Sequence, residues 1–360
     1  MRHRLEFLDF LRFVAAFAVL LQHGGEKLSP FFREISYNYF QFGVFGVTVF
    51  FLCSGFIIPV SLEKHGSLKK FWIGRIFRLF PLYYVSLIAT LALISLGLMA
   101  DPFPSLKVIL WNTTMLMRLV GQPCILGLYW TLSLEMVFYL IVSGLFILRM
   151  LSKTVVIAVG ALLFCFAFGV IAVKVLHFAE KGWGTAFYLA TMFTGSVIFK
   201  HYDKKISTRT LLTILGLAMC ILVANTYANL YGRPNNPEDL GIFSFVPVTS
   251  ALVSAYLLFM LGYFFRNKSF NPVFLRLGVV SYSLYLTQGL IFKTVPQIPG
   301  QPVLTFVMWI ALIVGISFIT YRYIEYPFLQ LGKTLTSKKQ TPIPGILASS
   351  EAGVNARNEK

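Results

Sequence analysis

The sequence predicts an all-α, polytopic membrane protein, and three observations lead to this fold class. The first is composition: 57% of the 360 residues are hydrophobic and only 12% are charged. An ordinary soluble domain is about 45–50% apolar and about 25% charged. The second observation is a series of apolar segments long enough to cross a bilayer. The third is the unequal distribution of basic residues between alternate loops.

About ten membrane-spanning helices are expected, because a bilayer core of roughly 30 Å needs about 20 apolar residues per helix. The connections between the segments are short, so residues 1–332 are expected to form one integral membrane domain. Residues 333–360 are polar and contain Ser, Lys and Pro, a composition typical of a disordered tail. The apolar segments are 5–23, 39–60, 77–99, 128–148, 155–176, 184–199, 210–230, 242–265, 277–295 and 302–321.

The formal net charge of +17 is explained by membrane topology rather than by nucleic-acid binding. With the N-terminus placed in the cytoplasm, 22 Lys and Arg residues fall on the cytoplasmic side of the ten segments and 8 on the outer side. An excess of basic residues in short loops marks the cytoplasmic side of a membrane protein. The N-terminus and the C-terminus are therefore both expected in the cytoplasm, and no nucleic-acid partner is expected.

The four cysteines lie far apart in the sequence, and three of them fall inside apolar segments. The sequence contains no CxxC pair and no Cys/His spacing that is typical of a metal site. It therefore predicts neither a metal site nor a disulfide framework.

The first apolar segment carries two polar side chains on one helix face. Arg12 and His23 are eleven residues apart, which is three helical turns plus about 20°, and about 16 Å along the axis. An arginine inside an apolar span costs roughly 2.5–3.5 kcal/mol on insertion scales, so it usually faces a protein interior or a wet cavity. Two interpretations are open: a polar track through the bundle, or an arginine that reaches the headgroups with a histidine at the opposite interface.

Basic and aromatic residues alternate in the segment 69–84, which includes Arg75 and Arg78 and contains Pro81. Such a segment beside a membrane helix is often an anchor to anionic lipid headgroups. Guanidinium groups also pair with phosphates, so the same residues are candidates to bind an anionic cofactor. The sequence leaves both interpretations open.

Glu135 is a carboxylate within the fourth apolar segment. If that helix enters from the outer side, Glu135 lies about 10 Å below the outer interface, on the side where His23 ends. An ionisable residue inside a membrane is a candidate functional group. Tyr139 follows one turn later on the same face. The alternative is that Glu135 is a structural partner for an arginine or a hydroxyl.

Two further pairs of residues are expected to have packing or surface roles. In the second apolar segment, Ser54 and Gly55 are small enough to let helices pack closely. Near the C-terminus, Arg322 and Glu325 are three residues apart, a spacing typical of an ion pair on a helix surface.

Together these segments resemble the membrane acyltransferase-3 family, which O-acylates envelope and secreted polysaccharides. The matching residues follow the family's order and extend over nearly the whole chain. One departure is Gln288, where the family usually has a histidine. The matching residues are Asp9, Arg12, His23, Phe51, Ser54, Gly55, Phe56, Arg75, Arg78, Pro81, Tyr83, Trp130, Ser133, Glu135, Tyr139, Ser281, Tyr282, Tyr285, Glu325 and Pro327.

The resemblance implies a multi-pass protein of the bacterial inner membrane that transfers an acyl group, most often acetyl. The donor would be cytoplasmic acetyl-CoA or another acyl-CoA, a co-substrate rather than a permanently bound cofactor. The acceptor would be a hydroxyl of an extracytoplasmic glycan or a lipid-linked oligosaccharide, with membrane lipids as the surroundings. The resemblance and the chemistry of the side chains together assign donor binding to Arg12, Arg75 and Arg78, catalysis to His23, Glu135 and Arg12, and substrate contacts to Ser54, Trp130, Tyr139 and Tyr285.

His23 is the candidate general base, because the ordinary pKa of histidine lies near physiological pH. Glu135 would orient its imidazole, and whether His23 is itself acylated is left open. Two other functions remain possible from the sequence: a transporter or flippase for a lipid-linked sugar or small solute, and a non-catalytic membrane partner in polysaccharide export. Transporters more often show inverted repeats or helices broken near the midplane.

Overall fold

The computed structural model describes residues 5–175, 183–231 and 244–337. Over these ranges the regular secondary structure is helical, without a β-strand. The elements in chain order are α1 (Glu6–Leu28), α2 (Pro30–Asn38), α3 (Phe42–His65), α4 (Leu68–Ser95), α5 (Leu106–Thr113), α6 (Tyr129–Ile147), α7 (Thr154–Phe166), the π-helix η1 (Ala167–Val175), α8 (Trp183–Tyr202), α9 (Thr208–Leu230), α10 (Phe245–Phe264), α11 (Pro272–Val279), α12 (Ser281–Thr294), α13 (Pro302–Thr320), the π-helix η2 (Tyr321–Glu325) and α14 (Tyr326–Thr336).

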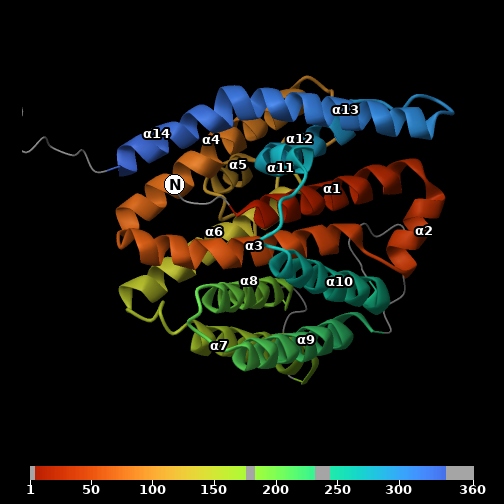
Figure 1. Ribbon diagram of the computed structural model, residues 1–360. Helices are drawn as coiled ribbons and strands as arrows, with labels where there is room; N and C mark the ends of the chain where they lie inside the picture. The colour runs from red at the N-terminus through yellow and green to blue at the C-terminus, as the bar shows by residue number, and fades with distance from the viewer. Residues whose placement is uncertain (1–4, 176–182, 232–243, 338–360) are drawn as a thin grey trace, which may run out of the picture.

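The long helices form one bundle and run along roughly the same direction (Figure 1). α1 and α3 lie in its middle, with α13 and α14 on one side and α7 and α9 on the other. In the apolar stretches of α1 and α3, 61% and 72% of the residues are buried. Only 28% are buried in the stretch from α7 into η1, and 22% in the stretch formed by α13 and α14. The outer helices therefore expose their apolar side chains, as helices in contact with lipid do.

The all-α membrane fold is confirmed, but the count of spans differs from the expected ten. Among the described residues, eight helical stretches are long and apolar enough to cross a membrane. They are α1, α3, α4, α6, the stretch from α7 into η1, α9, α10, and α13 with α14. The two that do not qualify correspond to the expected segments 184–199 and 277–295, and each has a different reason.

α8 occupies the place of the segment 184–199, but it is enclosed by protein. It runs parallel to α3, since Phe51 contacts Tyr188 near one end and Glu63 pairs with Lys200 near the other. The two helices approach closely, because Gly55 lies against the carbonyl oxygen of Met192 and Gly195 against that of Leu52. Its buried hydroxyls are paired with backbone carbonyls, and Ser196 Oγ donates to the Gly55 oxygen at 2.9 Å. A helix that does not face lipid can carry such polar residues, which lowers its hydropathy.

The segment 277–295 is divided into α11 and α12 at Val280, whose φ of −90° and ψ of 10° interrupt the α-helix. α11 begins at Pro272, and the Asn271 side chain accepts a hydrogen bond from the Val273 amide at 2.9 Å. α12 has 14 residues, about 21 Å of helix, which is shorter than the hydrocarbon core. Because of this break, neither α11 nor α12 alone is long enough to count as a membrane span.

The C-terminal boundary also differs from the expected one. α14 continues to Thr336, so the first residues of the predicted tail, 333–336, are helical. Residues 338–360 of that tail lie outside the described part of the chain. The division into a membrane domain and a disordered tail otherwise stays a prediction.

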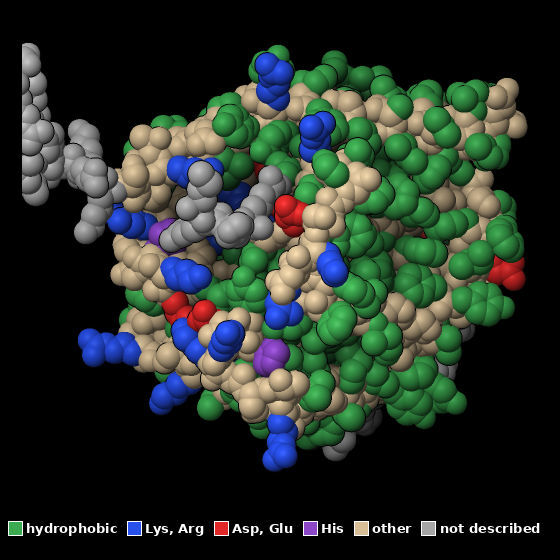
Figure 2. Space-filling model, viewed as in Figure 1, with side chains coloured by type: hydrophobic (Ala, Val, Ile, Leu, Met, Phe, Trp, Pro, Cys, Tyr) green, Lys and Arg blue, Asp and Glu red, His purple; other side chains and the backbone are tan. Residues whose placement is uncertain are grey.

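Lys and Arg side chains gather at one end of the bundle, where α3 ends and α4 begins (Figure 2). Two ion pairs lie there: Lys200 Nζ is 2.8 Å from a Glu63 oxygen, and Lys205 Nζ is 2.9 Å from an Asp203 oxygen. The Lys205 ammonium holds the pKa of the Asp203 carboxyl below its usual value by donating a hydrogen bond to it. The placement of this end in the cytoplasm stays a prediction.

The contact between α3 and α8 is expected to depend on its two glycines. A methyl group at Gly55 would overlap the Met192 carbonyl oxygen, and one at Gly195 would overlap that of Leu52. Overpacking costs typically about 1–3 kcal/mol, so Gly55→Ala and Gly195→Ala should each lower the free energy of unfolding by this order. Denaturation of the protein in detergent measures the effect.

Gly144→Ala in α6 is the matched control, because a carbon added there meets nothing within 4 Å. It should leave stability unchanged or raise it by about 0.5–1 kcal/mol, since alanine is the better helix former. Equal stability of the three variants would contradict the close packing of α3 on α8.

Candidate functional site

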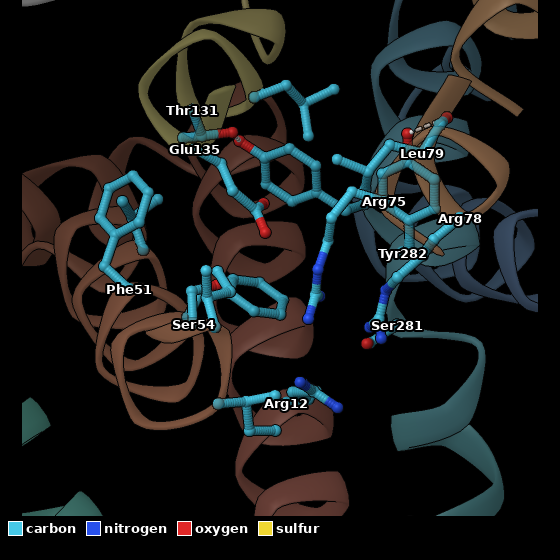
Figure 3. A pocket seen from close by; sticks show the side chains of 16 residues that line it. Arg12, Phe51, Ser54, Arg75, Arg78, Leu79, Thr131, Glu135, Ser281 and Tyr282 are labelled. Carbon is cyan, nitrogen blue, oxygen red and sulfur yellow. Dashed lines mark hydrogen bonds between the residues drawn. The ribbon is translucent and has the colours of Figure 1, made fainter. Parts of the chain in front are cut away.

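Side chains from five helices line a cavity inside the bundle (Figure 3). α1, α3, α4, α6 and α12 each contribute side chains to its wall. The wall has an apolar part from α3, with Phe50, Phe51 and Ile57, and a polar part from the other helices. Pockets that bind small molecules commonly combine apolar walls with a few polar groups in this way.

Three arginines line the cavity: Arg12 from α1, and Arg75 and Arg78 from α4. Their side chains point into the shared space (Figure 3). The Arg75 guanidinium lies over the rings of Phe71 and Tyr139, 5.3 and 5.6 Å from their centres. Both α4 arginines are half-buried and face the cavity, so the structure favours an internal anion site over a lipid-headgroup anchor for them.

Glu135 is the carboxylate among the lining residues, and its side chain points toward the same space (Figure 3). The Tyr139 hydroxyl, one turn later on α6, donates a hydrogen bond of 2.5 Å to Glu135 Oε1. Tyr139 is completely buried, which fixes this pair in the bundle. With three guanidinium groups against one carboxylate, the lining carries an excess of positive charge.

Glu325 is a second carboxylate close to the arginines. The prediction that it forms an ion pair with Arg322 on the surface is wrong. Glu325 is only 4% exposed, and Ser283 Oγ donates a hydrogen bond of 2.9 Å to its Oε2 atom. Its charge acts on Arg78 and Arg12. Arg322 instead lies over the ring of Tyr323, 5.9 Å from its centre.

Tyr285 lines the cavity on α12 and is tied to the start of α6. Its hydroxyl donates to the Leu128 carbonyl at 3.2 Å and accepts from Thr131 Oγ1 at 2.9 Å. Thr131 also lines the cavity and was not expected as a site residue. Its position four residues before Glu135 would have placed it on the same helix face.

The structure brings most of the predicted site residues to one cavity, but not all of them. Trp130 does not line it: its ring meets the edge of Phe51 at 6.3 Å, and the Arg118 guanidinium lies 5.6 Å from its centre. Tyr139 touches the site through Glu135. Among the described residues, those predicted and found in the cavity wall are Arg12, Ser54, Arg75, Arg78, Glu135 and Tyr285.

His23 lies outside this cavity, eleven residues further along α1 than Arg12. That distance is about 16 Å, and the His23 side chain is exposed. The structure does not bring His23 and Glu135 together, because Glu135 is bonded to Tyr139 and faces the arginines. The predicted orientation of the His23 imidazole by Glu135 is therefore absent from the geometry of the described residues.

A buried polar network surrounds the backbone next to His23. Gln22 Nε2 donates to Glu26 Oε1 and to Gln41 Oε1, both at 2.6 Å, and Ser36 Oγ donates to Glu26 Oε1 at 2.5 Å. The network ties the end of α1 to α2 and to the start of α3. Sequence reasoning missed it, although the spacing of four residues between Gln22 and Glu26 was a signal.

The fold and the cavity define a polytopic membrane protein with an internal cationic site. The acyltransferase-3 family model, whose description is "Acyltransferase domain", matches residues 5–322. The chain therefore belongs to the acyltransferase-3 family, and the resemblance of its sequence motifs is confirmed.

Several curated proteins are similar to this chain. "Putative peptidoglycan O-acetyltransferase YrhL" of Bacillus subtilis (strain 168) is 25% identical over 368 residues, covering 90% of this chain and 55% of that protein. "Putative O-acetyltransferase SAR0937" of Staphylococcus aureus (strain MRSA252) is 23% identical over 380 residues, covering 94% and 60%. "Putative acetyltransferase ORF330" of Acidianus two-tailed virus is 26% identical over 255 residues, covering 69% and 72%. The chain thus spans little more than half the length of the two bacterial relatives.

The hydrogen bond that holds Glu135 can be tested by stability. Tyr139→Phe removes the hydroxyl and keeps the ring under Arg75. A hydrogen bond to a charged group contributes about 1.5–3 kcal/mol, so the free energy of unfolding should fall by that order in a denaturation experiment. Tyr84→Phe is the control, because its hydroxyl bonds the Thr113 carbonyl on the exposed surface. Equal effects of the two substitutions would contradict a special role for the buried pair.

Proposed function

We propose that the protein is a membrane O-acyltransferase that moves an acyl group, in the first place acetyl, from acyl-CoA to a hydroxyl of an envelope polysaccharide. The observation that carries this proposal is the convergence of Arg12, Arg75 and Arg78 on one cavity within the bundle. Charged groups inside a membrane protein mark ligand and substrate sites. Family membership supplies the reaction class.

Coenzyme A fits the chemistry of the cavity wall. Its phosphates are anionic, and guanidinium groups bind phosphate oxygens with two parallel hydrogen bonds. Its pantetheine arm and acyl group are less polar, which suits the α3 wall of Phe50, Phe51 and Ile57. The phosphates would bind at the arginines, and the arm would extend along α1 toward His23.

Transfer requires a base for the acceptor hydroxyl, and His23 is the proposed one. The acceptor oxygen would attack the thioester carbonyl carbon while the imidazole takes the hydroxyl proton. The carbon–sulfur bond then breaks, and the coenzyme A thiolate receives that proton. His23 is exposed near the end of α1, so a large acceptor can reach it without entering the bundle. Glu135, which the arginines face, would act on the donor side.

The two ends of the bundle support a division between donor and acceptor. The end rich in Lys and Arg (Figure 2) would lie in the cytoplasm by the positive-inside rule, where acyl-CoA is available. His23 lies near the other end of α1, on the side of an extracytoplasmic or lipid-linked glycan. The Bacillus relative is named for peptidoglycan, which supports a cell-wall polysaccharide as the acceptor class.

Purified protein in proteoliposomes tests the function directly. Acetyl-CoA labelled in the acetyl group is supplied on one side and a polysaccharide acceptor on the other. An acyltransferase releases coenzyme A thiol and leaves labelled ester on the glycan. A transporter or flippase would move solute without releasing thiol, and a non-catalytic partner would do neither.

Arg78→Ala should weaken donor binding, because it removes a charge-assisted contact to phosphate. A loss of about 1.5–3 kcal/mol corresponds to roughly a 10–100-fold rise in the KM for acetyl-CoA. Lys69→Ala is the matched control: it removes an exposed positive charge at the start of the same helix and does not touch the cavity. An unchanged KM in a well-folded Arg78→Ala variant would show that the arginine does not bind the donor.

His23→Ala should lower kcat for transfer to the glycan by about 10²–10⁴-fold, the usual contribution of a general base. Donor binding should persist, because His23 lies outside the arginine-lined cavity. The control is His65→Ala, which removes an exposed histidine that bonds only Ser61 of its own helix among the described residues. Full activity of His23→Ala would exclude His23 as the base.

A further inference from the structure

Gln288 is a buried amide with unused hydrogen-bonding capacity. Its side chain is 0% exposed, and within the described ranges neither Oε1 nor Nε2 has a hydrogen-bond partner. Most buried side-chain polar atoms in folded proteins are paired, so this amide has a donor and an acceptor that a ligand or a water molecule could use. Two residues of the same helix, Ser281 and Tyr285, line the cavity.

Gln288 lies on the face of α12 that borders the cavity. At 100° per residue, Ser281, Tyr285, Gln288 and Phe292 fall within an arc of about 60°. Ser281 and Tyr285 line the cavity. Gln288 follows Tyr285 by three residues, about 4.5 Å further along the axis. The amide therefore lies one turn beyond Tyr285, on the same face of α12 as these two residues of the cavity wall.

Contacts of α11 and α12 with α1 fix the height of Gln288 in the bundle. At one end, Gly278 lies against the Asp9 carbonyl oxygen. At the other, a carbon built on Gly24 would lie 3.1 Å from the Phe292 ring, and Lys27 Nζ donates to the Phe292 carbonyl at 2.5 Å. The segments 9–24 and 278–292 are therefore parallel and in register.

This register places Gln288 level with residues 19–20 of α1. It is then about 11 Å beyond the level of Arg12 and about 5 Å short of the level of His23. The order along this interface is guanidinium cluster, neutral amide, imidazole. A donor whose phosphates bind the arginines would bring its thioester past the amide before it reaches His23.

We propose that the Gln288 side chain donates a hydrogen bond from Nε2 to the carbonyl oxygen of the acyl group on the donor. This inference rests on the proposed acyl transfer. When the acceptor oxygen bonds to the carbonyl carbon, the carbonyl π electrons move to the oxygen, which becomes an oxyanion. The His23 imidazole holds the acceptor's proton. The oxyanion then re-forms the double bond, the carbon–sulfur bond breaks, and the thiolate takes the proton.

A neutral amide suits this position better than a charged group would. The N–H donor stabilises the charge that develops on the oxygen and needs no proton exchange to do so. It also lies apart from the arginines, which would attract phosphate rather than a carbonyl group. Loss of one such donor typically costs about 10²–10³-fold in kcat.

Gln288→Met tests the donor, because methionine keeps a similar length and volume but has no N–H. The expected result is a fall in kcat of about 10²–10³-fold, with the KM for acetyl-CoA within twofold of the wild type. In isotope-edited infrared spectra, the carbonyl stretch of bound acetyl-CoA should move to higher frequency in the variant. Gln288→Leu provides a second variant if the methionine variant is unstable.

Ser317→Ala is the matched control, since Ser317 is another buried polar residue without a partner among the described residues, but it lies on α13, which contributes no residue to the cavity wall. It should keep the wild-type kcat. A kcat for Gln288→Met within tenfold of the wild type, a change confined to KM, or an equal loss in Ser317→Ala would each overturn the inference. Absence of transfer by the wild type would instead overturn the proposed function, and that assay is run first.

Discussion

The structure depends on one constraint: three guanidinium groups must be kept away from lipid inside a bundle of apolar helices. An arginine exposed to hydrocarbon is costly, so each one has to face protein or a wet cavity. Five helices converge on the three side chains, and carboxylates act on them from separate elements: Asp9 is 3.8 Å from Arg12, and the charge of Glu325 acts on Arg12 and Arg78. The cavity is the space that this arrangement leaves, and its chemistry follows from the same charges.

Much of the fold could be predicted from the sequence, because helices in contact with lipid must be long and apolar. The prediction failed where that requirement is absent or where the backbone bends. α8 lies against α3 through Gly55 and Gly195, so its sequence reflects packing on protein rather than on lipid. At Val280 the helix is interrupted, and hydropathy carries no signal of such a break.

The site was predictable within a helix and poorly predictable between helices. The spacings of Arg75 with Arg78 and of Glu135 with Tyr139 placed each pair on one face, and the structure keeps both pairs together. The bond between Ser283 and Glu325 joins residues 42 positions apart, which no periodicity reveals. The same limit applies to His23. The helix face on which it lies could be predicted from its spacing to Arg12, but the residues of other helices that lie near it could not.

The π-helical turn η2 sets the register of the last helix. At its end the Tyr326 amide bonds to the Tyr321 carbonyl, five residues back. This wide turn holds one residue more than an α-helical turn, and each residue rotates the following side chains by about 100°. Removing one residue here would swing Glu325 or Gly332, which packs on Phe77, off its present face. The number of residues in this turn is therefore a constraint on the fold in addition to their identities.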